Sequence, residues 1–149
     1  MDGVSEHTTP AAAPMLSPYR VLDLTDSRAE LATFVMAGLG ADVIKVEPPG
    51  GAESRHAAPR VPDEQGPDGL TSLRFHAFNR GKRSVILDLD RPEGRDDFLA
   101  LVATADFVFE NAGPGVLEVN VGSTRLSVAS VATVASAAPL PSGLNSVAP

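Results

Sequence analysis

Apolar positions between residues 19 and 110 form short runs that alternate with stretches of helical spacing. Residues 19–24 and 42–47 have the short apolar patterns of strands. Between them, residues 27–30 (Ser-Arg-Ala-Glu) have the pattern of a capping box that opens a helix through Leu39, where Gly38 and Gly40 stop it. A helix between two strands predicts a right-handed parallel β-α-β unit.

The same order of elements repeats further along the chain. Residues 84–89 predict a strand, and residues 90–93 (Asp-Arg-Pro-Glu) predict a second capped helix, with its proline at an early position, that runs to about residue 104. Residues 105–110 predict another strand, and the glycines of the turn at 111–115 allow the backbone to approach a ligand closely. We therefore predict an α/β fold with a mainly parallel sheet.

A long polar segment, residues 48–72, separates the two units. It contains five prolines and four glycines and is longer than most connections between elements. Loops of this length are usually functional or disordered, and we favour a functional loop.

Composition divides the chain into three parts. Residues 1–18 are rich in Pro, Ala and Thr and predict a disordered leader. Residues 19–118 carry the regular patterns. Residues 119–149 hold one charged residue, Arg125, in 31 positions, whereas the preceding 118 residues hold 30. We predict that this low-charge tail does not belong to the same domain.

Charge and residue types exclude several classes of function. With 19 acidic and 12 basic residues the net charge is −7, so we expect no nucleic-acid partner. The chain has no cysteine, and its three histidines are scattered, so we expect no metal site. It shows no export signal and no apolar run long enough to span a membrane, so we expect a cytoplasmic protein without a membrane partner.

A basic turn before the strand at 84–89 is the first candidate for chemistry. Arg80, Lys82 and Arg83 flank a glycine there, where cations and free amides could meet a phosphate. A solvated turn with salt-bridge partners is an equally good interpretation. Arg55, in the long loop, is a second candidate for clamping an anion, although a lone loop arginine is more often solvated.

Acidic residues lie near the carboxyl ends of the predicted strands, where open α/β sheets place their ligand sites. They are Asp23, Glu47, Asp88 and Glu110. Capping and solvation of strand ends explain most residues of this kind, and we favour that interpretation for each. The sequence has neither the G-x-G-x-x-G pattern after a strand nor a phosphate-loop motif, which disfavours dinucleotide and P-loop nucleotide sites.

Six blocks, taken in order, resemble one family. They are VLDLT at 21–25, LGADVIKVEPPGG at 39–51, NRGKRSV at 79–85, LDL at 87–89, PEGR at 92–95 and ENAGPG at 110–115. This set is similar to the class III CoA-transferases (CaiB/BaiF type), which include formyl-CoA and carnitine CoA-transferases and the related alpha-methylacyl-CoA racemases. The resemblance covers about residues 19–118.

The resemblance implies a Rossmann-like α/β domain, here incomplete, in a chain of several hundred residues that forms an interlocked homodimer. It implies coenzyme A, as acyl-CoA, and a small carboxylic acid as substrates. A family aspartate attacks the thioester and becomes an aspartyl-CoA thioester. By spacing, that aspartate would lie beyond Pro149, so we assign no catalytic residue, and we expect a homodimer for full-length relatives rather than for this chain alone.

The resemblance also carries over the residues that contact CoA. Leu87, Asp88 and Leu89 match the adenine-side segment. Asn111 and Ala112 match the turn beside the pantetheine and phosphates, and Ala29 matches the alanine of an A-G-P segment. Arg83 and Arg55 complete the predicted site as candidate anion contacts.

Two positions depart from the family pattern. Glu30 replaces the glycine of the A-G-P segment, which calls into question how closely CoA approaches that helix start. Val119 stands where relatives often carry an arginine for a phosphate of CoA, at the position where the composition changes.

Three functions follow as hypotheses. The first is an N-terminal CoA-binding fragment of a CoA-transferase, inactive alone, whose reading frame is disrupted near codon 119. The second is a fragment of a racemase-type enzyme. The third is a non-catalytic CoA-binding or interaction module that pairs with a full-length relative.

Overall fold

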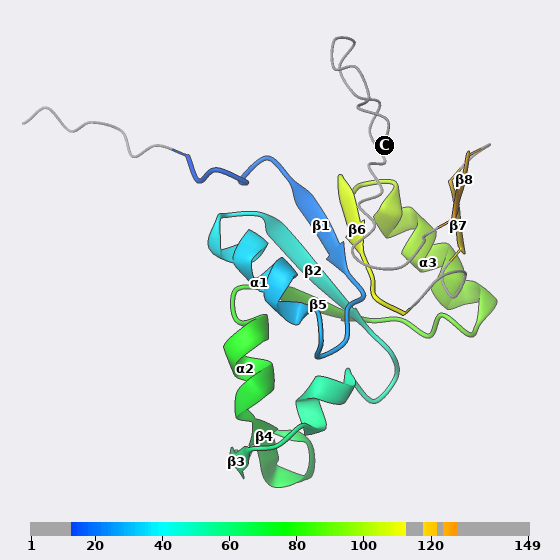
Figure 1. The fold of residues 1–149 in the computed structure, drawn as a ribbon. Coiled ribbons are helices and arrows are strands. Elements are labelled where there is room, and N and C mark those ends of the chain that lie inside the picture. The colour runs from blue at the N-terminus through cyan, green and yellow to red at the C-terminus, as the bar shows by residue number, and fades with distance from the viewer. Residues whose placement is uncertain (1–12, 113–117, 122–123, 128–149) are drawn as a thin grey trace, which may run out of the picture.

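Four parallel strands form the central sheet of the protein. The computed structural model describes residues 13–112, 118–121 and 124–127. The sheet has the order β5-β2-β1-β6, and its strands are β1 (Arg20–Asp23), β2 (Asp42–Glu47), β5 (Arg83–Ile86) and β6 (Phe107–Phe109). All three pairings between neighbours are parallel, which confirms the predicted α/β class (Figure 1).

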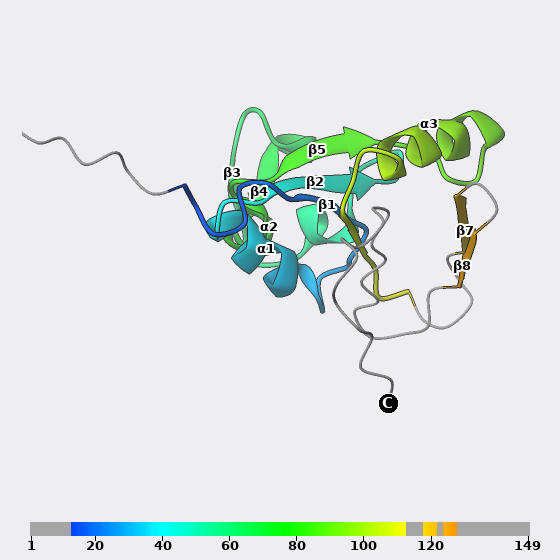
Figure 2. The same ribbon diagram turned by 90° about the horizontal axis from the view of Figure 1, so that it is seen from above.

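Helices lie on both faces of this sheet because successive residues of β1 and β2 point to opposite sides. Leu22 and Ile44 pack with Phe98 and Val102 of α3 (Pro92–Val102). On the other side, Val21 and Val43 pack with Met36 and Ala37 of α1 (Glu30–Gly38). Figure 2 shows α3 on one side of the sheet and α1 with α2 (Leu73–Asn79) on the other.

The long loop between β2 and α2 contains short elements. They are η1 (Glu53–His56), β3 (Arg60–Pro62), η2 (Pro67–Gly69) and β4 (Leu70–Ser72). β3 and β4 pair antiparallel as a sheet of their own. The loop is therefore a structured extension of the domain that leads directly into α2.

The two predicted ends of the chain are only partly within the described residues. Residues 13–18, from the predicted leader, include a turn in which Leu16 donates its N–H to the Leu39 carbonyl at 3.0 Å and packs on the apolar cluster beside α1. In the predicted tail, β7 (Glu118–Val121) and β8 (Thr124–Ser127) pair antiparallel. The rest of both segments lies outside the described residues.

The helix starts differ from the sequence prediction. The predicted capping box at residues 27–30 is wrong, because Ala29 is the N-cap of α1 and no side chain caps it. Glu30 is instead fully buried and bonded elsewhere. At α3, Pro92 occupies the first turn as predicted, but Arg91 is the N-cap and no side chain caps this helix either.

The strand prediction for residues 84–89 is only half right, and α2 was not predicted. β5 begins at Arg83 and ends at Ile86, so that Leu87, Asp88 and Leu89 form a loop beyond the sheet. Leu87 still donates its N–H to the Glu47 carbonyl of β2 at 2.9 Å, and Leu87 and Leu89 pack on the apolar cluster that includes Phe98 and Val102 of α3. This loop forms part of the candidate site.

Candidate functional site

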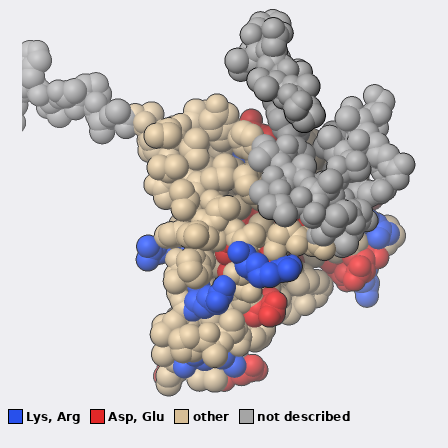
Figure 3. All heavy atoms as spheres, viewed as in Figure 1, with Lys and Arg blue, Asp and Glu red and all other residues tan. Residues whose placement is uncertain are grey.

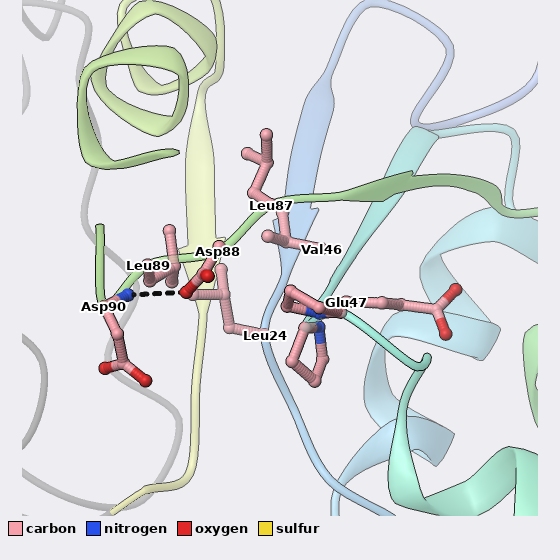
Figure 4. A pocket seen from close by; sticks show the side chains of 9 residues that line it. Leu24, Val46, Glu47, Leu87, Asp88, Leu89 and Asp90 are labelled. Atoms are coloured by element: carbon pink, nitrogen blue, oxygen red, sulfur yellow. Dashed lines mark hydrogen bonds between the residues drawn. The ribbon is translucent and has the colours of Figure 1, made fainter. Parts of the chain in front are cut away.

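A pocket of about 240 Å³ opens at the carboxyl ends of β1, β2 and β5. Open parallel sheets place their ligand sites at this edge. Residues from three strand ends line it, namely Leu24, Val46, Glu47, Pro48, Pro49, Leu87, Asp88, Leu89 and Asp90. Figure 4 shows the three predicted residues Leu87, Asp88 and Leu89 around this space.

The first turn of α3 fixes the loop that forms one wall of the pocket. Arg95 donates from Nη1 to the carbonyls of Leu89 and Asp90 at 3.2 and 3.3 Å. The Asp88 carboxylate accepts from the Asp90 N–H at 3.1 Å. A methyl group on Gly94 would lie 2.1 Å from the Asp88 carbonyl oxygen, so only glycine permits this close approach.

A second loop, residues 24–29, connects β1 to α1 and is joined to the loop after β6. Asp26 donates its N–H to Asn111 Oδ1 at 2.8 Å, and Asn111 Nδ2 donates to Asp26 Oδ1 at 2.7 Å. The Ala112 N–H binds Glu110 at 2.6 Å. Ala29 donates to the Asp26 carbonyl at 3.0 Å. Three more predicted residues, Ala29, Asn111 and Ala112, are therefore brought to one place at the carboxyl edge of the sheet.

The Asp26 carboxylate also binds the guanidinium of Arg28. Arg28 donates from Nε and Nη2 at 2.9 and 2.6 Å. These bonds, with that from Asn111, lower the pKa of Asp26 to about 2 despite its partial burial. Asp26 is thus an anion throughout the neutral range and holds Arg28 at the surface.

Behind this edge, between the sheet and α1, lie four buried charges. The Lys45 ammonium lies 3.0 Å from Glu30 Oε1 and donates to the Thr25 carbonyl at 2.9 Å. The Lys82 ammonium lies 2.8 Å from Asp23 Oδ2. Two lysines and two carboxylates balance, as burial of charge requires.

Burial and pairing act on the pKa values in this cluster. Burial would raise the pKa of Asp23, but the charges of Lys45 and Lys82 outweigh it and lower that pKa below its usual range. Burial lowers the pKa of Lys82, and the Asp23 carboxylate opposes that shift. The suggestion that Lys82 meets a phosphate is therefore wrong, because its ammonium is enclosed and already paired.

The acidic departure from the family pattern, Glu30, points inward. Its side chain accepts a hydrogen bond from Ser54 Oγ at 2.6 Å in addition to the Lys45 contact. Its charge is therefore neutralised inside the protein rather than presented at the helix start.

Arg55 also has an internal partner. It donates from Nε and Nη2 to the Glu47 carboxylate at 2.6 and 2.7 Å, and its guanidinium lies 4.0 Å from the ring centroid of Phe75. Burial would raise the pKa of Glu47, but bonds from Arg55, Ser84 and the Ala52 N–H lower it to about 2. In Figure 4 the Glu47 carboxylate points away from the pocket.

The structure does not bring Arg83 to the pocket. Arg83 begins β5, and its guanidinium binds Asp42 at the start of β2, with Nη2–Oδ2 at 2.6 Å. Both residues lie at the amino ends of the strands, the edge opposite the pocket. The basic turn predicted as one unit is thus divided between a buried Lys82 and an exposed Arg83.

Three arginines near the site were not singled out from the sequence. Arg28 and Arg95 make the contacts described above, and Arg74 of α2 donates from Nη2 to the Ser27 carbonyl at 2.6 Å. None lies at a spacing that marks a ligand site. Their importance depends on contacts between segments far apart in the chain.

Within the described part of the chain, no group of three or more His, Cys, Asp or Glu side chains is placed to hold a metal ion. No helix among these residues is long and apolar enough to cross a membrane.

Comparison with known proteins identifies one family. The family model described as CoA-transferase family III matches residues 16–129, which extends past the predicted boundary at residue 118. A succinyl-CoA:mesaconate CoA-transferase of Haloarcula hispanica is 46% identical over 104 residues, 69% of this chain and 26% of that protein. A formyl-CoA:oxalate CoA-transferase of Rhodopseudomonas palustris is 40% identical over 105 residues, 69% of this chain and 23% of that protein.

Solved structures agree with this comparison. A CaiB/BaiF family protein from Brucella suis matches with a TM-score of 0.60 and 38% identity, over 67% of this chain and 26% of that one. A hypothetical protein from Mycobacterium tuberculosis matches with a TM-score of 0.59 and 40% identity, over 69% of this chain and 27% of that one. The chain spans about a quarter of the length of these relatives.

Proposed function

The chain belongs to CoA-transferase family III, and from that premise we propose that it is the N-terminal, CoA-binding part of an enzyme that transfers CoA from an acyl-CoA to a small carboxylic acid. The observation that carries this proposal is the pocket at the carboxyl edge, where Leu87, Asp88 and Leu89 lie together. The resemblance assigns these residues to the adenine side of CoA.

The path proposed for CoA follows from the positions of the two loops. The adenine end enters the pocket beside Leu87–Leu89. The phosphates and pantetheine then pass the turn formed by Asn111 and Ala112, next to Ala29 at the start of α1. The loop at residues 24–29 and the loop after β6 form the two sides of this part of the path. The two hydrogen bonds between Asp26 and Asn111 hold these loops at a fixed distance from each other.

The resemblance supplies the chemistry. A family aspartate attacks the thioester carbonyl and forms a mixed anhydride as CoA leaves as a thiolate; the thiolate then attacks the aspartyl carbonyl, which releases the donor acid and forms an aspartyl-CoA thioester. The acceptor acid attacks this thioester to form a second mixed anhydride and releases the CoA thiolate again. The thiolate then attacks the acceptor's acyl carbonyl, which gives the new acyl-CoA and frees the aspartate. We propose that these 149 residues alone do not catalyse CoA transfer. Three of the four strand-end carboxylates support this, since Asp23, Glu47 and Glu110 are each at most 1% exposed. The fourth, Asp88, lines the pocket but accepts a hydrogen bond from the Asp90 N–H and pairs with Arg91 at 3.2 Å.

We favour transfer over racemisation and over a purely structural role. Both curated relatives named above are CoA-transferases. Of the arginines suggested for anion binding, the proposal includes neither Arg83, which lies at the opposite edge, nor Arg55, whose guanidinium holds Glu47. Both assignments stay predictions from the sequence.

Calorimetric titration of the 149-residue chain with CoA tests the proposal. We expect binding that Leu89→Trp abolishes, because the larger ring fills the pocket, and that Leu73→Trp leaves unchanged, because Leu73 is exposed on α2 away from it. Equal effects of the two substitutions would contradict the assignment of the pocket. Acyl-CoA exchange by this chain alone would contradict its inactivity.

A further inference from the structure

Two neighbouring side chains of η1 bind two buried carboxylates that belong to different parts of the proposed CoA site. Ser54 Oγ donates to Glu30 Oε1 at 2.6 Å, and Glu30 directly follows Ala29 at the start of α1. Arg55 donates to both oxygens of Glu47, the last residue of β2, at 2.6 and 2.7 Å. Figure 3 shows basic and acidic side chains side by side at the surface, whereas Glu30 and Glu47 are each at most 1% exposed.

The contact at α1 depends on few donors. Glu30 Oε2 has no hydrogen-bond partner within the described part of the chain, so Oε1 alone receives the donors. These donors are the Ser54 hydroxyl and the Lys45 ammonium, which lies 3.0 Å away. Ser54 is itself 1% exposed, so water does not replace its hydroxyl in this contact. Removing the hydroxyl would therefore release η1 from the start of α1.

The contact at β2 fixes orientation as well as distance. Arg55 binds Glu47 through two parallel N–H donors, and its guanidinium stacks 4.0 Å from the ring centroid of Phe75. The Ala52 N–H, just before η1, donates to the same carboxylate at 2.8 Å. At Gly51, where φ is +86°, an added Cβ would lie 2.7 Å from Arg55 Cδ. Glycine at this position therefore leaves room for the arginine side chain to reach Glu47.

These two contacts connect both parts of the proposed CoA path. Glu47 and the two prolines that follow it line the pocket assigned to the adenine end. Ala29, next to Glu30, is assigned to the stretch beside the phosphates and pantetheine. Because Ser54 and Arg55 are consecutive in one short helical turn, their Cα atoms are about 3.8 Å apart. The two carboxylates are thus held at a fixed separation by η1.

We propose that Ser54 and Arg55 are positioning residues that hold the two parts of the CoA site at the spacing that one CoA molecule requires. This inference rests on the proposed function. Neither residue is among those that line the pocket, so both act through the carboxylates that they bind. Glu30, which stands where the family pattern has a glycine, provides the contact at α1.

The experiment compares two ligands that differ in how much of the site they reach. CoA extends over both parts, whereas adenosine reaches only the pocket. We expect Ser54→Ala to weaken CoA binding about tenfold in calorimetric titration, and to change adenosine binding by less than about twofold in titration followed by NMR of the ligand. A smaller folded fraction would lower the binding of both ligands equally, so the ratio of the two affinities reports the spacing alone.

Arg55 provides an independent variant at the other contact. Arg55→Gln should also weaken CoA binding more than adenosine binding. Arg55→Lys keeps the charge but cannot donate in parallel to both oxygens, so it should recover part of the CoA affinity.

Arg20→Gln is the matched control. Arg20 also pairs with a carboxylate, that of Asp42 at 2.8 Å, and its side chain is 38% exposed, against 32% for Arg55. It lies at the amino ends of the strands, the edge opposite the pocket. We expect this substitution to leave the ratio of CoA to adenosine affinity unchanged.

A double-mutant cycle tests whether Ser54 acts through Glu30. If it does, Ser54→Ala and Glu30→Gln together should weaken CoA binding by less than the product of their separate effects. Multiplied effects would overturn the assigned route.

The outcomes separate this inference from the proposed function. If Ser54→Ala and Arg55→Gln weaken CoA and adenosine equally, or leave CoA binding unchanged, the positioning role alone is overturned. An equal change of the ratio in Arg20→Gln would overturn it as well. Failure of the unsubstituted chain to bind CoA or adenosine would overturn the proposed function, and this inference with it.

Discussion

The Lys82 ammonium lies 2.8 Å from the Asp23 carboxylate, although the two residues are 59 positions apart in the chain. Lys82 also donates to Thr33 Oγ1 and Asn79 Oδ1, both at 2.9 Å. One side chain from the turn before β5 therefore joins the end of β1, the middle of α1 and the end of α2. With its side chain 1% exposed, it makes these contacts in place of water.

We expect Lys82→Met to destabilise the fold strongly. Without Lys82, the buried cluster holds two carboxylates against one ammonium, that of Lys45, which lies 3.0 Å from Glu30 and only 3.8 Å from Asp23. Breaking a buried ion pair in this way costs about 3–5 kcal/mol. Urea unfolding of the 149-residue chain, followed by circular dichroism, measures the change. Arg83→Gln is the control, since Arg83 is exposed and pairs with Asp42 at the surface, where such pairs contribute about 0–1 kcal/mol. Similar losses for the two variants would contradict a special role for Lys82.

The contrast between Lys82 and Arg83 shows where prediction from the sequence ends. The strands of the sheet follow from local alternation of apolar residues, and the predicted β2 has the observed bounds, Asp42–Glu47. Nothing local distinguishes two neighbouring cations in one turn. Lys82 is buried because it pairs with Asp23, and Arg83 stays exposed because it pairs with Asp42 at the surface. Both partners are far from this turn in the sequence.

The same reasoning applies to the site. The family resemblance assigned Leu87, Asp88 and Leu89 to the site, whereas the local pattern placed them inside a strand that in fact ends at Ile86. Arg95 and Gly94, which shape that loop, lie in what the pattern predicts only as a helix. Helix α2 was missed because it has only seven residues, too few to show a helical period, and because its cap, Ser72, accepts from the Phe75 N–H without the glutamate of a capping box.

A pH dependence is expected from Glu47. Its pKa is about 2 in the folded protein, below its ordinary value of 4.5, so the stability it contributes is fully present above about pH 4.5 and is lost as the pH falls towards 2. Glu47→Gln should lower the free energy of unfolding at pH 7. The difference in this free energy between the variant and the unsubstituted chain should shrink as the pH falls from about 4.5 towards 2. Urea midpoints measured from pH 7 to pH 2.5 test this. Glu53 is an exposed glutamate in the same loop, so the control Glu53→Gln should have little effect on stability at pH 7. If the stability difference caused by Glu47→Gln stayed constant from pH 7 to pH 2.5, the low pKa of Glu47 would be contradicted.

The hydrogen bonds between Asp26 and Asn111, which join the loop at 24–29 to the loop after β6, should matter more for ligand binding than for folding. Asp26→Asn removes the charge that holds Arg28 and disturbs the paired bonds with Asn111. We expect about tenfold weaker CoA binding, because hydrogen bonds to a charged group contribute about 1.5–3 kcal/mol. Asp63→Asn is matched, since Asp63 also accepts from the N–H two residues later but lies in the distant loop around β3. If both variants bind CoA as tightly as the unsubstituted chain, the Asp26–Asn111 hydrogen bonds are not needed for the CoA site.

Gly94 provides a test of the pocket wall that changes one methyl group. At this position in the first turn of α3, an added Cβ would meet the Asp88 carbonyl oxygen at 2.1 Å and the Asp88 carbonyl carbon at 2.7 Å, so the loop through Asp88 and Leu89 must move. We expect Gly94→Ala to destabilise the chain by about 1–3 kcal/mol and to weaken CoA binding.

In α1, Gly38→Ala adds the same methyl group where nothing lies within 4 Å, and the better helix propensity of alanine should stabilise the chain by up to about 1 kcal/mol. Urea unfolding and CoA titration of the two variants compare these effects. Opposite signs for the two stability changes, with a loss of CoA affinity only for Gly94→Ala, are the expected result, whereas normal CoA affinity in Gly94→Ala would mean that the loop does not contact the ligand.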